Sequence, residues 1–242
     1  MEKILKILEV IGVAGQKQLG KDTIADTLAP LLRRQAWVHY QDSSERIDAP
    51  WKRNSFAAPV KSMYCQYFGK NLAFIEEWKE RKECPPGMKK SVREALTFIG
   101  EGFRNIQPDI WINMALNNPD AYYKTIFSDA RYLNEAARIK SQNGFIILVY
   151  RPGKINDDPN QSEAQVRPFL EWCANTGKEG LINSWRNFNE ISEYDESRGF
   201  KKDLACYDYF INNDGDLASL KAKVIVLAEY LKQDYDIGSN YQ

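Results

Sequence analysis

The residues best suited to chemistry lie near the N-terminus, in the segment GVAGQKQLGKDT at positions 12–23. Two glycines bracket four residues and a lysine follows, which is the G-x-x-x-x-G-K spacing of a phosphate-binding loop. In such a loop, backbone N–H groups and the next helix N-terminus surround a phosphate, and the lysine neutralises its charge. The residues expected to contact phosphate are Gly15, Gln16, Lys17, Gln18, Leu19, Gly20, Lys21, Asp22 and Thr23.

The position after Lys21 departs from this pattern. Asp22 stands where phosphate loops carry Ser or Thr, and Thr23 comes one place late. A carboxylate is a hard oxygen ligand suited to Mg²⁺, so Asp22 is a candidate metal ligand. The alternative is that Asp22 caps the following helix or favours its first turn electrostatically, and the two roles are compatible.

The elements that would position this loop can be predicted from hydrophobic patterning. An apolar stretch at 4–13 precedes the loop and predicts a strand, and helical spacing follows it. Residues 145–150, FIILVY, are continuously apolar, which is typical of a parallel strand buried on both faces. A short strand over 125–128 leads into another helix, whereas 41–54 is polar and predicts a loop. Strands alternating with helices predict a doubly wound α/β fold.

Composition excludes several classes of function. Lys and Arg balance Asp and Glu at 33 each, so no basic field would recruit nucleic acid or an anionic membrane. Four cysteines without metal-ligand spacing and a single histidine argue against a zinc site. The N-terminal stretch has no signal-peptide pattern, and no run approaches the roughly 20 apolar residues of a spanning helix. We therefore expect a cytoplasmic protein.

Five segments in register resemble the deoxynucleoside monophosphate kinases of tailed phages, within the P-loop kinase superfamily. The resemblance is thin over 70–90 and 154–206, and Thr97 and Glu101 stand where that family has Gln and Thr. The matching segments are the loop ending in G-K-D-T, FAAPVK at 56–61, VREALTFIGEGFRNIQPDIWINMAL at 92–116, FSDARYLNEAARIKSQNGFIILVYRPG at 127–153 and DYFINNDGDLASL at 208–220.

This resemblance implies a three-layer α/β/α P-loop kinase fold with a mostly parallel central sheet. It implies one domain over 1–242, with an acceptor-binding helical insertion at about 60–118 and a lid-like insertion at about 154–206. The implied reaction transfers a phosphoryl group from ATP, with Mg²⁺, to a (deoxy)nucleoside 5′-monophosphate and gives the diphosphate. Oligomers are common among such kinases, so a homodimer is left open. For a phage-encoded chain the compartment would be the host cytoplasm.

Phosphoryl transfer depends on positioning two phosphates and neutralising their charge, which predicts arginines and a metal around the loop. Asp129 ends a predicted strand, where open α/β sheets bind ligands, although it could instead cap the next helix. The expected catalytic residues are Lys21, Asp22, Arg104, Asp129 and Arg131. The expected metal ligands are Asp22 and Asp129. The expected acceptor-binding residues are Lys61, Arg93, Arg104, Trp111 and Arg131.

Each acceptor residue has a structural alternative. Arg104 could form a surface salt bridge with Glu101 or Asp109, and Trp111 on an amphipathic helix favours packing. Arg93, Arg131 and Lys61 could be solvated charges. Further candidates for contacting the nucleotide or closing over it as a lid are Lys17, Arg151, Arg167, Lys178, Arg186 and Arg198.

Two other functions stay open. One is a P-loop kinase with a different acceptor, such as a hydroxymethylated base in DNA or a phosphomevalonate-like small molecule. The other is a nucleotide-binding module without transfer. The balanced charge argues against a DNA acceptor. The presence of Lys21, Arg104, Asp129 and Arg131 together argues against a module without transfer.

Overall fold

The computed structural model of the chain describes residues 6–32, 34–39, 44–49, 51–117, 124–155, 157, 161–181 and 203–236. The chain divides into two compact units. Unit 1 comprises residues 1–54 and 122–242, and unit 2 comprises residues 55–121. None of the described helices has the length and apolar character that crossing a bilayer requires.

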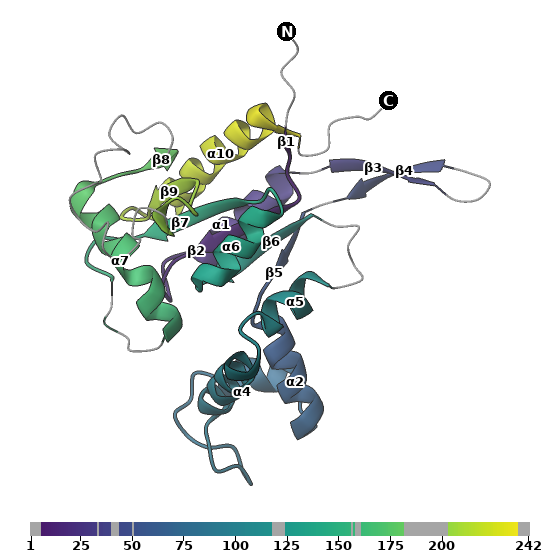
Figure 1. Cartoon of the computed structure of the whole chain (residues 1–242), viewed down its shortest axis with the longest axis vertical. Helices are drawn as coiled ribbons and strands as arrows, with labels where there is room; N and C mark the ends of the chain where they lie inside the picture. Colours follow the sequence, from purple (N-terminus) through teal and green to yellow (C-terminus); the bar gives the residue numbers. More distant parts are fainter. Residues whose placement is uncertain are drawn as a thin grey trace. The chain divides into compact units, whose positions relative to one another are not determined.

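Unit 1 is built on a six-stranded sheet in the order β5-β6-β2-β7-β9-β8 (Figure 1). Its first five strands are parallel, and β8 pairs antiparallel with β9. β2 and β7 are buried along their whole length, as expected for parallel strands covered on both faces. The strands are β2 (Val10–Ala14), β5 (Lys52–Asn54), β6 (Thr125–Ala130), β7 (Phe145–Tyr150), β8 (Gly180–Leu181) and β9 (Tyr209–Asn212).

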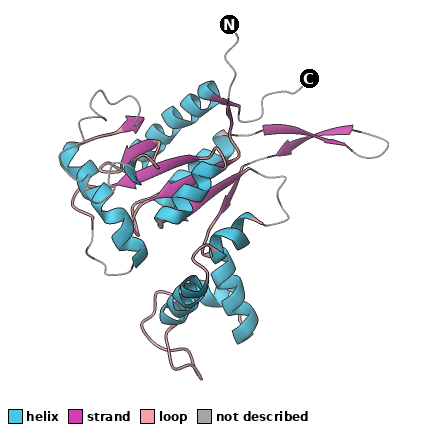
Figure 2. Cartoon of the chain, in the orientation of Figure 1, coloured by secondary structure: helices cyan, strands magenta, loops and turns pink. Residues whose placement is uncertain are grey.

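Helices cover both faces of this sheet (Figure 2). α1 (Lys21–Leu31) packs on β2, β5 and β6 and against α10 (Leu217–Asp234), whereas α6 (Leu133–Ser141) packs on β2 and β7. The crossovers from β2 to β5 and from β6 to β7 run in opposite directions along the sheet. Because such crossovers are right-handed, α1 and α6 lie on opposite faces. The predicted three-layer α/β/α architecture with a mostly parallel sheet is therefore confirmed.

Part of the segment expected to be a lid is a helix that packs on the central sheet. α7 (Gln161–Thr176) packs on β7, and Val166, Leu170 and Cys173 on its inner face are buried. The hydrophobic periodicity of this segment is weak and Pro168 lies within it, so the sequence did not predict a helix here. Residues 182–202 lie outside the described residues, so a lid there stays a prediction.

Two small sheets correct further expectations. β3 (Arg34–His39) and β4 (Ser44–Ala49) form an antiparallel pair, so the loop expected over 41–54 is wrong at β4 and at β5. The strand expected over 4–13 is two strands, because β1 (Lys6–Ile7) pairs with β10 (Tyr235–Asp236) rather than with the main sheet. The strand expected over 125–128 continues to Ala130.

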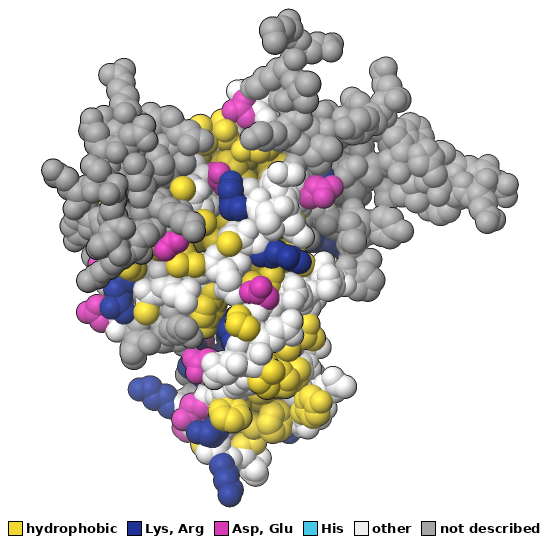
Figure 3. Space-filling view, viewed as in Figure 1, with side chains coloured by type: hydrophobic (Ala, Val, Ile, Leu, Met, Phe, Trp, Pro, Cys, Tyr) yellow, Lys and Arg dark blue, Asp and Glu magenta, His cyan; other side chains and the backbone are white. Residues whose placement is uncertain are grey.

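Unit 2 is helical, and an acceptor-binding insertion was expected over about 60–118 in this part of the chain. Its helices pack around the buried side chains of Tyr64, Ile75, Val92 and Ala95. Figure 3 shows hydrophobic side chains gathered on the surface of this unit. Phe98 of α4 is one of its exposed large hydrophobic residues. The helices are α2 (Ala58–Phe68), α3 (Leu72–Trp78), α4 (Val92–Ile106) and α5 (Ile110–Leu116).

Two local features fix the helices of unit 2. Pro59 lies in the first turn of α2, where a missing N–H costs no helical hydrogen bond. Ser91 and Glu94 form a reciprocal capping box that begins α4. Trp111 of α5 is fully buried against Phe103, and its indole N–H donates to the Gly100 carbonyl oxygen at 2.9 Å.

The buried indole hydrogen bond gives a stability prediction. We expect Trp111→Phe to lower the free energy of unfolding by about 1–3 kcal/mol, because the buried Gly100 carbonyl loses its indole donor. Urea denaturation followed by circular dichroism measures this change. Phe98→Leu, at an exposed aromatic of α4, is the control and should change the value by less than about 0.5 kcal/mol. Equal losses in both variants would contradict the prediction.

Candidate functional site

The loops that follow β2 and β6 diverge at the carboxyl edge of the sheet. The two strands are neighbours, with Ile11 paired to Ile126 and Ala14 to Ala130. Because α1 and α6 cover opposite faces, these loops leave the sheet in opposite directions. This is the switch point at which open α/β sheets bind ligands. It brings the phosphate loop and the end of β6 to the same edge.

The phosphate loop has a backbone that only glycine accommodates at two positions. Gly15 and Gly20 have φ of 144° and 92°. A Cβ at Gly15 would lie 2.6 Å from the Val149 carbonyl oxygen, and one at Gly20 would lie 2.8 Å from the Asn213 amide nitrogen. The Asn213 amide also donates to the Leu19 carbonyl at 3.0 Å. The loop is therefore tied to the carboxyl ends of β7 and β9.

Lys21 is buried at the start of α1. Its ammonium donates to the Gln16 carbonyl oxygen within the loop, and only 7% of the residue is exposed. Burial and, to a smaller extent, the nearby Arg131 charge lower the pKa of Lys21 to about 8, although the carboxylates of Glu163, Asp129 and Asp22 partly offset this change. A buried cation at a helix N-terminus is electrostatically unfavourable, and a bound phosphate would relieve that cost.

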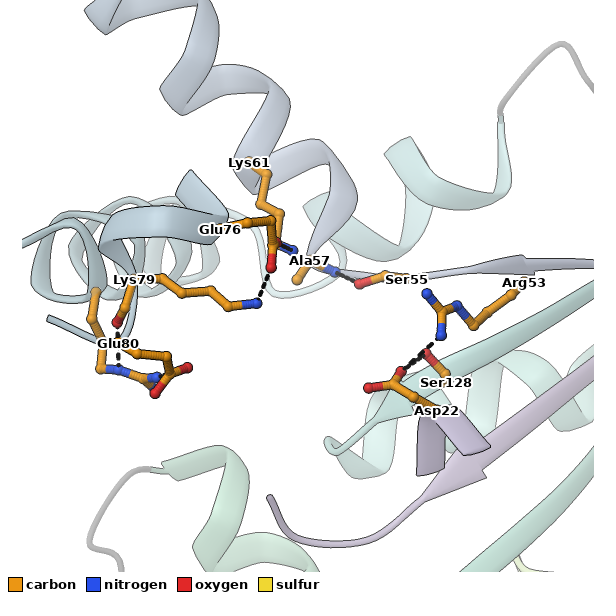
Figure 4. A network of polar contacts seen from close by, with 10 residues as sticks. Asp22, Arg53, Ser55, Ala57, Lys61, Glu76, Lys79, Glu80 and Ser128 are labelled. Atoms are coloured by element: carbon orange, nitrogen blue, oxygen red, sulfur yellow. Dashed lines mark hydrogen bonds and ion pairs between the residues drawn. The ribbon is translucent and has the colours of Figure 1, made fainter. Parts of the chain in front are cut away.

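Asp22 points into a polar cluster at the same edge (Figure 4). The Ser128 hydroxyl donates to its Oδ1 at 2.8 Å, and Arg53 Nη1 lies 3.6 Å from the same oxygen. Arg53 also pairs with Asp26 at 2.8 Å. The Asp22 side chain is 75% exposed, and α1 begins without a side-chain cap. The capping alternative for Asp22 is therefore not what the structure contains, although its charge still favours the first turn.

Asp129 and Arg131 follow one another at the end of β6. Asp129 is near enough to Lys21 to raise its pKa. The cap of α6 is instead provided by Glu135, whose carboxylate accepts the backbone N–H of Arg131 at 2.8 Å and of Tyr132 at 3.1 Å. The Arg131 side chain forms an ion pair with Glu163, a buried carboxylate in the first turn of α7.

Two of the predicted acceptor residues of unit 2 form ion pairs with carboxylates at the surface. Lys61 pairs with Glu76 at 2.9 Å (Figure 4), and Arg93 pairs with Glu80 at 2.6 Å. Such exposed pairs contribute little to stability and exchange readily. Arg104 lies over Gly100 of the same helix, within 3.6 Å of where a Cβ would stand. The burial of Trp111 agrees with the packing alternative.

The further candidates for nucleotide or lid contacts are dispersed. Arg151 directly follows β7, at the carboxyl edge. Arg167 on α7 pairs with Asp157 at 3.4 Å, and the Lys178 carbonyl accepts the Tyr150 hydroxyl at 2.9 Å. Arg186 and Arg198 lie outside the described residues.

Four residues that the structure brings to this edge received no functional role from the sequence patterns. Arg53 lies in β5, which was expected to be loop, and Ser128, which precedes Asp129, was given no role. Asn213 lies in the matching segment at 208–220, but its contact with the loop joins residues nearly two hundred positions apart, so the segment alone does not indicate this role. Glu163 had a signal, because QSEAQ at 161–165 partly matches the His-x-Ser-Glu of the phage kinases.

The chain is similar to a protein of Acanthamoeba polyphaga mimivirus named "Putative deoxynucleotide monophosphate kinase". The two are 27% identical over 180 residues, which cover 67% of this chain and 84% of the relative. No protein-family model matches. Among solved structures, dephospho-CoA kinase from Campylobacter jejuni aligns with a TM-score of 0.42 at 13% identity, covering 94% of this chain and 98% of that one. Shikimate kinase from Acinetobacter baumannii aligns with a TM-score of 0.36 at 15% identity, covering 93% and 92%.

The lowered pKa of Lys21 gives a pH-dependent prediction. The unfolded chain binds this proton more tightly than the folded protein, so the cost of burial is fully present below pH 8 and disappears as the pH rises to 10.5. Lys21→Met should therefore raise the free energy of unfolding at pH 7, by at most roughly 3 kcal/mol. The gain should shrink between pH 8 and pH 10.5.

Chemical denaturation at a series of pH values measures this difference between variant and unmodified protein. Lys221→Met, at an exposed position of α10, is the control and should change the free energy of unfolding by less than about 0.5 kcal/mol. A loss of stability in Lys21→Met that is the same at every pH would show that the buried charge carries no cost.

Proposed function

We propose that this protein is an ATP- and Mg²⁺-dependent kinase that phosphorylates deoxynucleoside 5′-monophosphates to diphosphates. The observation that carries the proposal is the buried Lys21 in a glycine-bounded loop at the switch point of the sheet. The name of the mimivirus relative supports the choice of acceptor. An acceptor that is itself a phosphate also suits a protein with several predicted phosphate-binding arginines.

On the donor side, the loop N–H groups and the N-terminus of α1 would surround the β- and γ-phosphates of ATP. Lys21 would neutralise them, and this contact would stabilise the charged form of a lysine that burial otherwise disfavours. Arg131 would add a guanidinium, which matches phosphate oxygens with two parallel hydrogen bonds. Together these groups would hold the transferring phosphoryl group without covalent chemistry by the protein.

The carboxylates at the edge of the sheet fit a Mg²⁺ ion that is shared with the phosphates. Mg²⁺ typically takes one or two carboxylates, several waters and substrate phosphates. Asp22 suits this role because its side chain is 75% exposed and Ser128 fixes one of its oxygens; Asp129 is the second candidate. The described residues contain no cluster of three or more His, Cys, Asp or Glu that would hold a metal by themselves. The ion would supply charge neutralisation at the transferring phosphate.

The acceptor monophosphate is assigned to unit 2. Arg104 is the principal phosphate contact in this proposal, with Arg93 and Lys61 as further contacts. Lys61 and Arg93 would exchange their surface carboxylates for phosphate, which costs little because exposed ion pairs are weak. Trp111 would act indirectly, by holding α4 through the Gly100 carbonyl.

The reaction is tested by ADP formation from ATP with and without a panel of deoxynucleoside monophosphates. We expect one or more of them to stimulate turnover, and Lys21→Met to lower it at least about 100-fold. Stimulation by hydroxymethylated DNA alone would replace the proposed acceptor. Tight ATP binding without turnover for any acceptor would indicate a nucleotide-binding module and contradict the proposal.

The role of Arg104 is tested separately. Arg104→Met should raise KM for the acceptor about 10- to 100-fold and leave the Kd of ATP unchanged, because a charge-assisted contact to the acceptor phosphate is lost. Arg81→Met is the matched control, since Arg81 is an exposed arginine of unit 2 that pairs with Glu77. Unchanged acceptor kinetics in Arg104→Met would remove Arg104 from the site.

A further inference from the structure

Glu163 joins three segments that follow neighbouring strands of the sheet. Its Oε2 accepts the backbone N–H of Lys17, in the phosphate loop after β2, at 2.9 Å. Its Oε1 pairs with the guanidinium of Arg131, which follows β6. Glu163 itself lies in the first turn of α7, after β7. One carboxylate therefore connects the carboxyl ends of β6, β2 and β7.

Neighbouring contacts reinforce this connection. The fully buried Gln16 side chain donates to the Glu163 carbonyl oxygen at 3.4 Å. Gln165, two residues further on, accepts the backbone N–H of Leu133 at 3.0 Å, where α6 begins. The start of α7 is thus attached to both the phosphate loop and the segment after β6.

The burial of Glu163 explains why its carboxylate holds the Arg131 guanidinium in a defined place. Only 2% of this residue is exposed, and a buried carboxylate is tolerated when it is paired and hydrogen-bonded. Removing either partner is costly, so the Arg131 guanidinium is held in a defined place. A guanidinium has five N–H donors in a rigid fork, and the pairing at Nη1 therefore orients the whole group.

We propose that Glu163 is a positioning residue. One of its carboxylate oxygens is anchored to the phosphate loop, and the other orients Arg131 toward the phosphate held by that loop. This inference rests on the proposed function, because it gives Arg131 a phosphate to contact. Glu163 should matter for the rate of transfer through Arg131, and much less for binding of ATP, which Lys21 and the loop N–H groups provide.

The chain offers a matched control with the same chemistry at the opposite edge of the sheet. One oxygen of Asp208 pairs with Lys140 at 2.6 Å, and the other accepts the backbone N–H of Ile146 at 2.8 Å. Asp208 directly precedes β9, at the amino end of the parallel strands. Asp208→Asn and Glu163→Gln therefore each remove the charge of a carboxylate that bridges a cation and a backbone N–H. Of the two residues, only Glu163 lies at the candidate site.

The first test measures nucleotide binding by calorimetry and kcat with the best acceptor. Glu163→Gln should lower kcat about 10- to 100-fold, because a misplaced phosphate contact slows transfer. It should change the Kd of ATP by less than about threefold. Asp208→Asn should leave both values unchanged. A Glu163→Gln variant with unchanged kcat, or with tighter ATP binding and unchanged kcat, would overturn the proposal.

The second test asks whether Glu163 acts through Arg131. In a double-mutant cycle, Glu163→Gln should have little further effect on kcat in an Arg131→Met background, whereas independent contributions would multiply and contradict the proposal. In the nucleotide-free protein, the side-chain NMR resonance of Arg131, assigned with Arg131→Met, should shift in Glu163→Gln and stay in Asp208→Asn. An unshifted resonance would also overturn the inference. Because this resonance needs no turnover, it separates failure of the inference from failure of the proposed function.

Discussion

The arrangement of the candidate site depends on one electrostatically unfavourable feature, a lysine ammonium group, that of Lys21, buried at the N-terminus of α1. Both the loss of water and the positive end of the helix disfavour its charge, and Arg131 adds a second cation nearby. Three carboxylates, of Asp22, Asp129 and Glu163, compensate in part. Two cations and three anions therefore lie around a loop of backbone N–H donors, and this arrangement is the basis for proposing that a phosphate and its metal ion bind there.

The sheet fixes where that charge lies. Gly15 approaches the Val149 carbonyl and Gly20 approaches Asn213, so the two ends of the loop are held by β7 and by the residue that follows β9. β7 is built from apolar residues that are buried on both faces, and Phe210 and Ile211 of β9 are buried beside it. The hydrophobic pattern of β7 and β9 thus positions a polar loop that is remote from them in the sequence. A change in this core would act on the site through the loop backbone.

The sequence predicted the features that local chemistry encodes. The loop is a short motif, and the continuous run FIILVY predicted β7 with its observed bounds. β5 was missed because a three-residue strand of Lys, Arg and Asn has no hydrophobic signal, and its pairing with β6 depends on the assembled sheet. α7 was missed because Pro168, a residue that normally breaks a helix, lies inside it, although Val166, Leu170 and Cys173 keep helical spacing. The partner of a carboxylate such as Glu163 depends on tertiary structure, which spacing along the chain does not encode.

The same distinction separates the donor from the acceptor of the proposed reaction. The donor side depends on backbone geometry and burial, as at Gly15, Gly20 and Lys21, where few sequences satisfy the constraints. The proposed acceptor side uses long cationic side chains of unit 2, and two of them, Lys61 and Arg93, pair with carboxylates at the surface. Such side chains can be replaced with little effect on stability. Selection can therefore change the acceptor while the loop stays the same, which is why the motif identifies phosphoryl chemistry more sharply than it identifies a substrate.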